Sequence, residues 1–240
     1  MLVTIHQPNY LPWPGFFHKW LLSDAFIVLD TVQFHKNEWQ NRNRIKSLHG
    51  PQWVTVPVSF SFPDPIQNVQ VSPGPWARKQ IAAIEQAYAR APFLDRYWPE
   101  LKVVIESHGI SLCELNVALI RLLGGMCGCS APLYLASDMR TSSQDPTQRL
   151  VGLCRELDAD GYLSGREGRH YLDRQAFEEA GIALYFQEVE PPVYPQLHGD
   201  FMPCLSVLDL LFNVGPEAPA LIRAMGGIRY EKDSGAGSAS

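Results

Sequence analysis

The chain has 240 residues, of which 46% are hydrophobic and 19% are charged, so it can bury a large apolar core without disulfides or a metal ion. Its formal net charge is −5, and its basic cluster (Lys36, Arg42, Arg44 and Lys46) is too small to track along a nucleic-acid duplex. The five cysteines lack zinc or redox spacing, the N-terminus lacks the pattern of a signal peptide, and no apolar run could span a membrane. We therefore expect a compact cytoplasmic protein with reduced cysteines, no metal site built on them and no extended nucleic-acid partner.

Short apolar runs and amphipathic segments alternate along the chain. Residues 2–5 predict a strand, the prolines between positions 8 and 14 a loop, residues 15–22 a helix and the apolar run 25–29 a strand buried on both faces. A strand, helix and strand in this order imply a parallel pair. Further strands are expected at residues 53–60, 133–137, 161–164 and 182–189, and further helices at residues 76–90, 94–105, 112–123, 148–157, 176–180 and 205–213.

This alternation predicts an α/β fold, with a mostly parallel sheet and helices on both of its faces. We expect a single domain over residues 1–232, with a helical insertion at about residues 76–125. Residues 233–240 are of low complexity and predict a disordered tail.

Polar side chains follow the first two predicted strands, where ligands bind in parallel α/β sheets. After the second strand, Asp30 could orient a histidine, bind a sugar hydroxyl or hold a metal ion, or it could simply cap the next turn. The first loop could likewise use its polar groups to satisfy its own backbone. The candidates from the two loops are His6, Gln7, Asn9, Tyr10, Asp30 and Gln33.

A third cluster, at residues 39–44, alternates arginines with amides beside an aromatic ring. The guanidinium of Arg42 suits a phosphate or carboxylate, the amide of Asn41 suits sugar hydroxyls, and Trp39 could stack on a base or a sugar ring. The alternative is a solvated polar loop.

A fourth cluster lies in the second half of the chain. Ser164 and Arg166 belong to a small, glycine-containing loop that resembles an anion site. Tyr194 and Gln196 add polar groups further on, and Asp209 stands in an apolar helical string, where a carboxylate is costly unless it is paired. Asp209 could therefore be a structural ion-pair partner instead of a ligand-binding residue. No histidine pair has metal-ligand spacing, and the nucleophile elbow, Walker A and dinucleotide glycine patterns are absent.

Long motifs in the chain resemble the WbqC-like family. They run from Ile5 to Pro12, from Trp39 to Ile45, from Tyr162 to Gly165 and from Leu205 to Gly215, so the resemblance spans about residues 3–216. This family occurs among bacterial surface-polysaccharide (O-antigen) genes. The resemblance therefore implies work on a sugar or a nucleotide-linked sugar, without supplying a mechanism.

The opening of the chain is also similar to HIGH-type nucleotidyltransferases, which implies a Rossmann-like topology. The two-histidine signature of that class is missing, because Tyr10 to Trp13 stand in its place. This departure puts the standard adenylyl-transfer chemistry in doubt.

Together, the residues and the resemblance predict a group-transfer enzyme, of acyl or aminoacyl type, that modifies a sugar, an amino sugar or a nucleotide-sugar with an activated donor. His6 would be the general base, oriented by Asp30, while Asn41 and Arg42 would bind the donor. One alternative is nucleotidyl or phosphoryl transfer, with Asp30 and Asp209 holding Mg²⁺. Another is a non-catalytic sugar-nucleotide-binding subunit. The sequence leaves the cofactor and the oligomeric state open.

Overall fold

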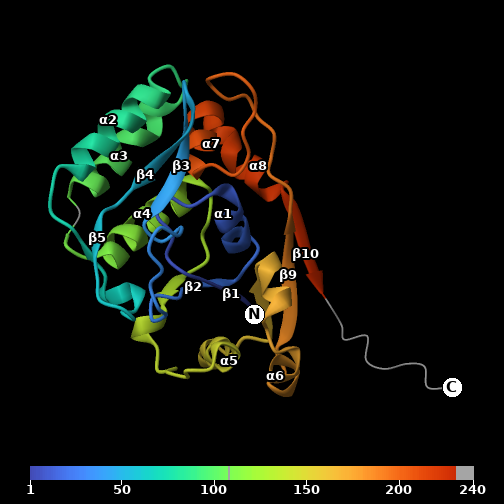
Figure 1. Ribbon diagram of the computed structural model, residues 1–240. Helices are drawn as coiled ribbons and strands as arrows, with labels where there is room; N and C mark the ends of the chain where they lie inside the picture. The colour runs from blue at the N-terminus through green and yellow to red at the C-terminus, as the bar shows by residue number, and fades with distance from the viewer. Residues whose placement is uncertain (108, 231–240) are drawn as a thin grey trace.

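The computed structural model describes residues 1–107 and 109–230, and a six-stranded sheet lies at the centre of this part (Figure 1). The strand order is β10-β9-β8-β1-β2-β7; all neighbouring pairs are parallel except β9 and β10. The strands are β1 (Leu2–His6), β2 (Ala25–Val28), β7 (Leu133–Leu135), β8 (Gly161–Ser164), β9 (Ala183–Val189) and β10 (Gly226–Tyr230).

The order of the parallel strands is that of a doubly wound sheet. From β1 the chain moves outward through β2 to β7, then returns to the other side of β1 and moves outward through β8 to β9. The direction therefore reverses between β1 and β8, and a crevice forms beyond the carboxyl ends of strands at such a point. The α/β class and the mostly parallel sheet are confirmed.

Two apolar cores cover the two faces of the sheet, because side chains of each strand alternate between them. Val3 and Ile5 of β1 face one core, whereas Phe26 and Val28 of β2 face the other. The first core is closed by α5 (Pro146–Glu156) and α6 (Arg174–Glu179). The helices of the second core are α1 (Pro14–Leu21), α2 (Trp76–Tyr88), α3 (Leu94–Glu106), α4 (Leu112–Met126), α7 (Val207–Val214) and α8 (Ala218–Arg223).

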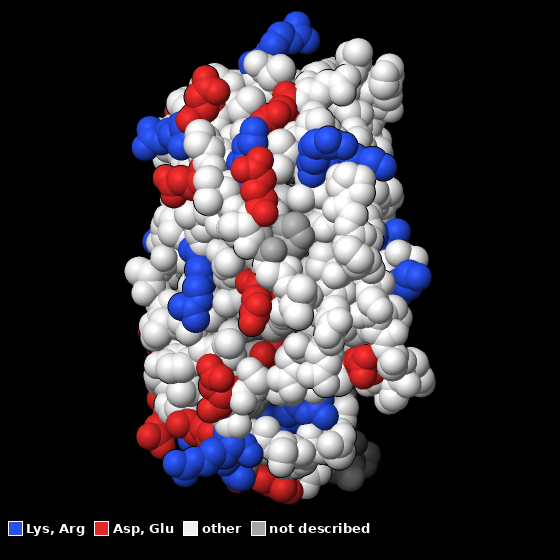
Figure 2. Space-filling model, turned by 90° about the vertical axis from the view of Figure 1, so that its left-hand side faces the viewer, with Lys and Arg blue, Asp and Glu red and all other residues white. Residues whose placement is uncertain are grey.

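The helices α2, α3 and α4 occupy the segment expected to be a helical insertion. Figure 2 shows the face that carries α2 and α3, where basic and acidic side chains are interspersed without a continuous basic stripe. None of the helices in the described part of the chain has the length and apolarity needed to cross a bilayer. The predicted tail at residues 233–240 lies outside the described residues.

Residues 42–44 belong to a hairpin of β3 (Arg42–Ser47) and β4 (Gly50–Thr55) that was not predicted from the sequence. Its alternation is hidden in the sequence because polar residues stand on both faces. The buried side chains of Asn43 and Lys46 donate hydrogen bonds to Leu11 and Gln196, which lie in other segments. The strand expected at 53–60 is instead divided between β4 and β5 (Val58–Ser59), which pairs with β6 (Gln70–Val71). The sequence reading also missed α8 and β10. Short 3₁₀ helices complete the chain at η1 (Ile66–Asn68), η2 (Ala136–Asp138), η3 (Arg166–His170) and η4 (Gly215–Glu217).

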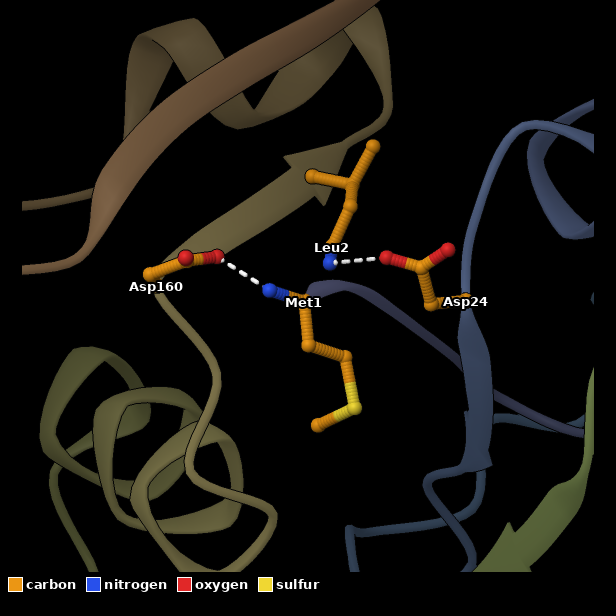
Figure 3. Close-up of polar contacts among 4 residues, drawn as sticks. All are labelled: Met1, Leu2, Asp24 and Asp160. Atoms are coloured by element: carbon orange, nitrogen blue, oxygen red, sulfur yellow. Dashed lines mark hydrogen bonds and ion pairs between the residues drawn. The ribbon is translucent and has the colours of Figure 1, made fainter.

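The amino end of β1 is fixed to both of its neighbours (Figure 3). The ammonium group of Met1 pairs with Asp160, just before β8, and the Leu2 amide donates to the carboxylate of Asp24 at 2.7 Å, just before β2. These contacts align β8, β1 and β2 at one end of the sheet. The crevice lies at the opposite end, where the strand order reverses.

Candidate functional site

A crevice of about 810 Å³ opens beyond the carboxyl ends of β1 and β8, at the point where the strand order reverses. We call it the switch-point crevice. The first turns of α1, the loop after β2 and the end of β9 complete its walls. The polar and aromatic side chains in its lining include His6, Gln7, Trp13, Phe16, Lys19, Gln33, His35, Arg149, Tyr162, Ser164, Arg166, Glu167, Tyr171 and Gln187, together with Cys204.

His6 is the last residue of β1 and is half-buried in this crevice. Its ring meets the edge of Phe16 at a centroid distance of 4.7 Å, and its Nδ1 lies 2.9 Å from the carbonyl oxygen of Gln7. Burial, and then the charge of Lys19, lower the pKa of His6 to about 3, against the opposing effect of that carbonyl. The ring is thus neutral at physiological pH. With Nδ1–H donating to the carbonyl, Nε2 remains an acceptor.

Lys19 lies on the same face of α1 as Phe16, one turn further along, and its side chain enters the crevice. Only 4% of the residue is exposed, yet within the described part of the chain its amine makes no hydrogen bond and no ion pair. A Cβ built on Gly165, in the loop after β8, would lie 3.9 Å from this amine. Burial lowers the pKa of Lys19 to about 7. Lys19 can therefore take up or release a proton near neutral pH.

The rest of the lining favours an anionic ligand with a flat, apolar part. Lys19, Arg149 and Arg166 are basic, whereas Glu167 is the acidic residue among the lining side chains. The first turn of α1 also borders the crevice, and a helix N-terminus attracts negative charge. Aromatic rings supply the apolar wall, namely Trp13, Phe16, Tyr162 and Tyr171.

Two glycines let these walls approach each other closely. A Cβ on Gly15 would lie 2.2 Å from the ring of Trp13, so only glycine lets that ring pack over the start of α1. A Cβ on Gly168 would lie 2.1 Å from the Oγ of the buried Ser164, so glycine also lets η3 fold back onto the end of β8. These close contacts give the crevice its shape.

The switch-point crevice unites part of the first, second and fourth clusters predicted from the sequence. Residues far apart in the chain meet there because β1 lies between β2 and β8. The predicted residues that line it are His6, Gln7, Gln33, Ser164 and Arg166.

The expected pair of His6 and Asp30 is wrong. The carboxylate of Asp30 accepts hydrogen bonds from the backbone amide of Ser137 at 2.9 Å and from its hydroxyl at 2.6 Å. The Cys113 thiol also donates to this carboxylate at 3.9 Å, and Asp30 is buried and does not line the crevice. Asp30 thus anchors the turn after β7, while the Gln7 carbonyl takes the role of orienting His6.

Three other predicted residues are buried in the framework around the crevice. The hydroxyl of Tyr10 donates to Gln80 at 2.6 Å, and Asn9 is 7% exposed and does not line the crevice. The amide of Asn41 donates to the carbonyl of Val56 at 3.0 Å. The side chains of Tyr10 and Asn41 therefore bond to the framework, and neither they nor Asn9 line the crevice, which corrects their expected role in binding a ligand there.

Tyr194, Gln196 and Asp209 meet in a second place, away from the crevice lining. The fully buried carboxylate of Asp209 accepts hydrogen bonds from Tyr88 at 3.0 Å, Tyr194 at 2.8 Å and Gln196 at 2.7 Å. The amine of Lys46 donates to Gln196 at 3.2 Å. We call these five residues the Asp209 network. Burial raises the pKa of Asp209, and the three donors and Lys46 oppose that effect.

The structure does not support a shared Mg²⁺ site at Asp30 and Asp209. Each carboxylate has its own separate set of donors, Ser137 for Asp30 and the Asp209 network for Asp209. Among the described residues, no group of three or more histidine, cysteine or acidic side chains is placed to hold a metal ion.

The sequence reading missed Lys19, which is the most unusual group in the crevice. A signal was present, because Lys19 follows the apolar Phe16 by three residues, a spacing that places both on one face of the expected helix. The remaining missed residues, such as Arg149 and Gln187, carry no local motif. Trp39 and Arg42, the last two predicted residues, lie on the hairpin of β3 and β4 and the loop before it.

Comparisons with known proteins agree with the motifs. A family model described as the WbqC-like protein family matches residues 7–221. The chain is 36% identical over 225 residues to the uncharacterized protein Rv1507c of Mycobacterium tuberculosis (strain ATCC 25618 / H37Rv), covering 92% of this chain and 97% of the relative. No solved structure matches the chain.

Proposed function

The chain belongs to the WbqC-like protein family, and we propose that it is a group-transfer enzyme whose reaction takes place in the switch-point crevice. Its substrate in this proposal is a sugar, an amino sugar or a nucleotide-linked sugar of polysaccharide or related biosynthesis. The observation that carries the proposal is Lys19, a residue only 4% exposed whose amine has no partner among the described residues and which lines the crevice next to the neutral ring of His6. Perturbed titratable groups of this kind in a crevice are typical of catalytic sites.

In the proposed step, an amine or hydroxyl of the acceptor attacks the carbonyl carbon of an activated acyl or aminoacyl donor. Lys19 takes the proton that the attacking group loses, because its pKa of about 7 suits a general base at neutral pH. The new carbon–nitrogen or carbon–oxygen bond forms, and the bond to the leaving group breaks with its electron pair. The Lys19 ammonium then returns the proton to the leaving group. His6, with a pKa of about 3, is too weak a base for this role and instead offers Nε2 as a hydrogen-bond acceptor.

The charges of the lining support an anionic donor or a nucleotide-linked sugar. Arg166 is exposed at the rim and has no ion pair in the described part of the chain, so it is available to a phosphate or carboxylate. Tyr171, which is 64% exposed at the same rim, offers a ring for stacking.

The test is a thermal-shift and turnover experiment with UDP-N-acetylglucosamine and related UDP-amino sugars, with acyl-coenzyme A or aminoacyl-adenylate donors. We expect the Lys19→Met variant to lose about 10²–10⁴-fold in turnover while it still binds the nucleotide-sugar. In the unmodified protein, kcat/KM should rise with pH through about 7, because only the neutral amine accepts a proton.

Lys79→Met, which removes an exposed lysine of α2, is the matched control and should retain full turnover and the same pH profile. Full turnover in Lys19→Met would contradict the assignment of Lys19. Binding without turnover, with any donor, would instead support the non-catalytic subunit.

Nucleotidyl transfer is a second candidate, favoured by the position of the crevice at the reversal of strand order, where doubly wound folds bind nucleotides. It is also the reaction that a relation to HIGH-type nucleotidyltransferases would imply. This candidate predicts release of diphosphate from a nucleoside triphosphate, abolished by EDTA and restored by Mg²⁺. Activity that is unchanged in EDTA would favour acyl or aminoacyl transfer.

A further inference from the structure

The hairpin of β3 and β4 and the loop before it carry an aromatic and basic surface that the proposed reaction does not use. We call Trp39, Arg42, Arg44 and Trp53 the Trp–Arg platform. The rings of Trp39 and Trp53 are 5.8 Å apart at their centroids and tilted by 36°. The guanidinium of Arg42 lies 4.1 Å from the Trp53 centroid, and that of Arg44 lies 5.7 and 5.9 Å from the two rings.

The strand register explains how these side chains come together. Arg44 is directly opposite Trp53 in the antiparallel ladder, and Arg42 is two residues away on the same face. Asn43 and Ile45 point to the other face and are buried there. The sequence of β3 therefore places both arginines on the outer side of the hairpin.

Stacking of arginine on tryptophan stabilises a hairpin by itself, so the stack alone does not call for a ligand. The polar atoms of the platform do. The Nε atoms of Arg42 and Arg44 are buried without an acceptor, and none of their other guanidinium nitrogens has a partner among the described residues. The indole N–H groups of Trp39 and Trp53 likewise make no hydrogen bond in residues 1–107 or 109–230. Only the two Nε atoms are fully enclosed, so the other guanidinium nitrogens and the indole N–H groups are open to an acceptor on a bound molecule.

The chemistry of the platform fits one kind of ligand. Trp39 and Trp53 are 42% and 45% exposed, so each presents a flat apolar surface. No ion pair of the described residues involves Arg42 or Arg44, and Glu38, the acidic residue next to Trp39 in the chain, pairs with neither. The apolar faces of sugar rings suit indoles, and carboxylates suit guanidinium groups.

We infer that the Trp–Arg platform binds an anionic saccharide, whose sugar rings stack on the two indoles and whose carboxylates pair with the two arginines. The loop that carries Trp39 is joined to the crevice, because the amide of Gln40 donates to the side chain of Gln7 at 2.6 Å. The saccharide would therefore lie beside the loop that forms one wall of the crevice. The inference does not depend on the reaction in the crevice.

The test is a titration of the full chain with tetra-galacturonate, followed by tryptophan fluorescence and by calorimetry. We expect saturable binding that weakens as salt concentration rises, because salt screens ion pairs at the partly exposed surface that carries the two arginines. Maltotetraose, which has the same length and no charge, should bind at least about tenfold more weakly. Arg44→Gln and Trp53→Ala should each weaken tetra-galacturonate binding at least about tenfold.

The control variant is Tyr134→Ala, which removes an aromatic side chain of similar exposure (40%) on β7 and should leave binding unchanged. Circular dichroism checks that each variant is folded. Equal binding of maltotetraose, or unchanged binding in Arg44→Gln, would overturn the inference. Lys19→Met should bind tetra-galacturonate normally, and Trp53→Ala should keep its thermal shift with UDP-N-acetylglucosamine, so failure of one proposal is distinguishable from failure of the other.

Discussion

Two buried lysines mark two regions of the molecule that differ in how their polar groups are paired. Lys46, 2% exposed, donates to the side chain of Gln196 and to the carbonyls of Gly199 and Asp200 within the Asp209 network and its loop. Lys19, 4% exposed, has no such partner among the described residues and borders an open crevice. The first lysine stabilises a fold, and the second is available for chemistry.

The difference shows that a polar motif in the sequence can serve either the stability of the fold or the chemistry of a site. In the Asp209 network, every oxygen of the carboxylate is occupied by a donor from another segment, which fixes the loop at residues 190–206 against α2 and α7. In the crevice, the groups of His6 and Lys19 that can accept or donate protons face a space large enough for a ligand. Occupied donors and acceptors indicate structure, whereas buried and unoccupied ones indicate function.

The largest effect on stability is expected at the centre of the Asp209 network. Asp209→Ala should lower the free energy of unfolding by about 3–5 kcal/mol, because it leaves three donors without an acceptor and Lys46 without a compensating charge. Asp209→Asn, which keeps one oxygen acceptor and the volume, should cost less. Urea denaturation measures both, and Glu100→Gln on the exposed face of α3 is the control. A loss below about 1 kcal/mol in Asp209→Ala would mean that the network is not structural.

The opposite sign is expected at Lys19, because this residue is only 4% exposed and its ammonium group has no ion pair among the described residues. Lys19→Met should raise the free energy of unfolding by about 2–4 kcal/mol at pH 6, where the amine is charged in both the folded and the unfolded state. The folded pKa of about 7 lies below the ordinary value of 10.5, so this gain shrinks as pH rises between the two values and is absent above both. Denaturation curves at pH 6 and pH 9 measure it. A variant that is less stable at pH 6 would contradict the comparison of the two lysines.

A smaller effect is expected from a single donor of the network. Tyr194→Phe removes only the hydroxyl that donates to Asp209 at 2.8 Å, which should cost about 1–2 kcal/mol. Tyr134→Phe removes an exposed hydroxyl and should be neutral. Both variants should keep the thermal shift with UDP-N-acetylglucosamine. A lost shift in Tyr194→Phe alone would instead tie the network to ligand binding.

The sheet and most helices were predictable from apolar patterns. The run at residues 25–29 is buried on both faces as β2, and the helices at residues 76–90, 94–105 and 112–123 have counterparts in α2, α3 and α4. The hairpin of β3 and β4 was not predictable, because the polar residues Asn43 and Lys46 are buried and donate hydrogen bonds to carbonyl groups of other segments. Burial of this kind depends on partners that are distant in the chain, so it leaves no local period.

The site was predictable as a location and less so as a set of residues. The rule that ligands bind beyond the carboxyl ends of parallel strands pointed to the loop that follows β1, and the structure places His6 and Ser164 in one crevice there, which the sequence had left open. The same rule says nothing about side-chain direction. Asp30 was therefore expected to orient His6, whereas its carboxylate contacts Ser137. Lys19 escaped notice because a lysine on a surface helix is usually solvated, and only the packing of α1 on β1 reveals its burial.

The contacts at the amino end of β1 also fix its register, and the register decides which of its side chains face the crevice. Side chains of a strand alternate between faces, so a shift of β1 by one residue would exchange them all. His6 would then turn from Phe16 toward the core that now holds Val3 and Ile5. The pairing of Met1 with Asp160, and of Leu2 with Asp24, holds β1 in its register at the end of the sheet opposite the crevice. Contacts at one end of β1 thus determine which side chain lies in the crevice at its other end, although the residues that make them take no part in the proposed reaction.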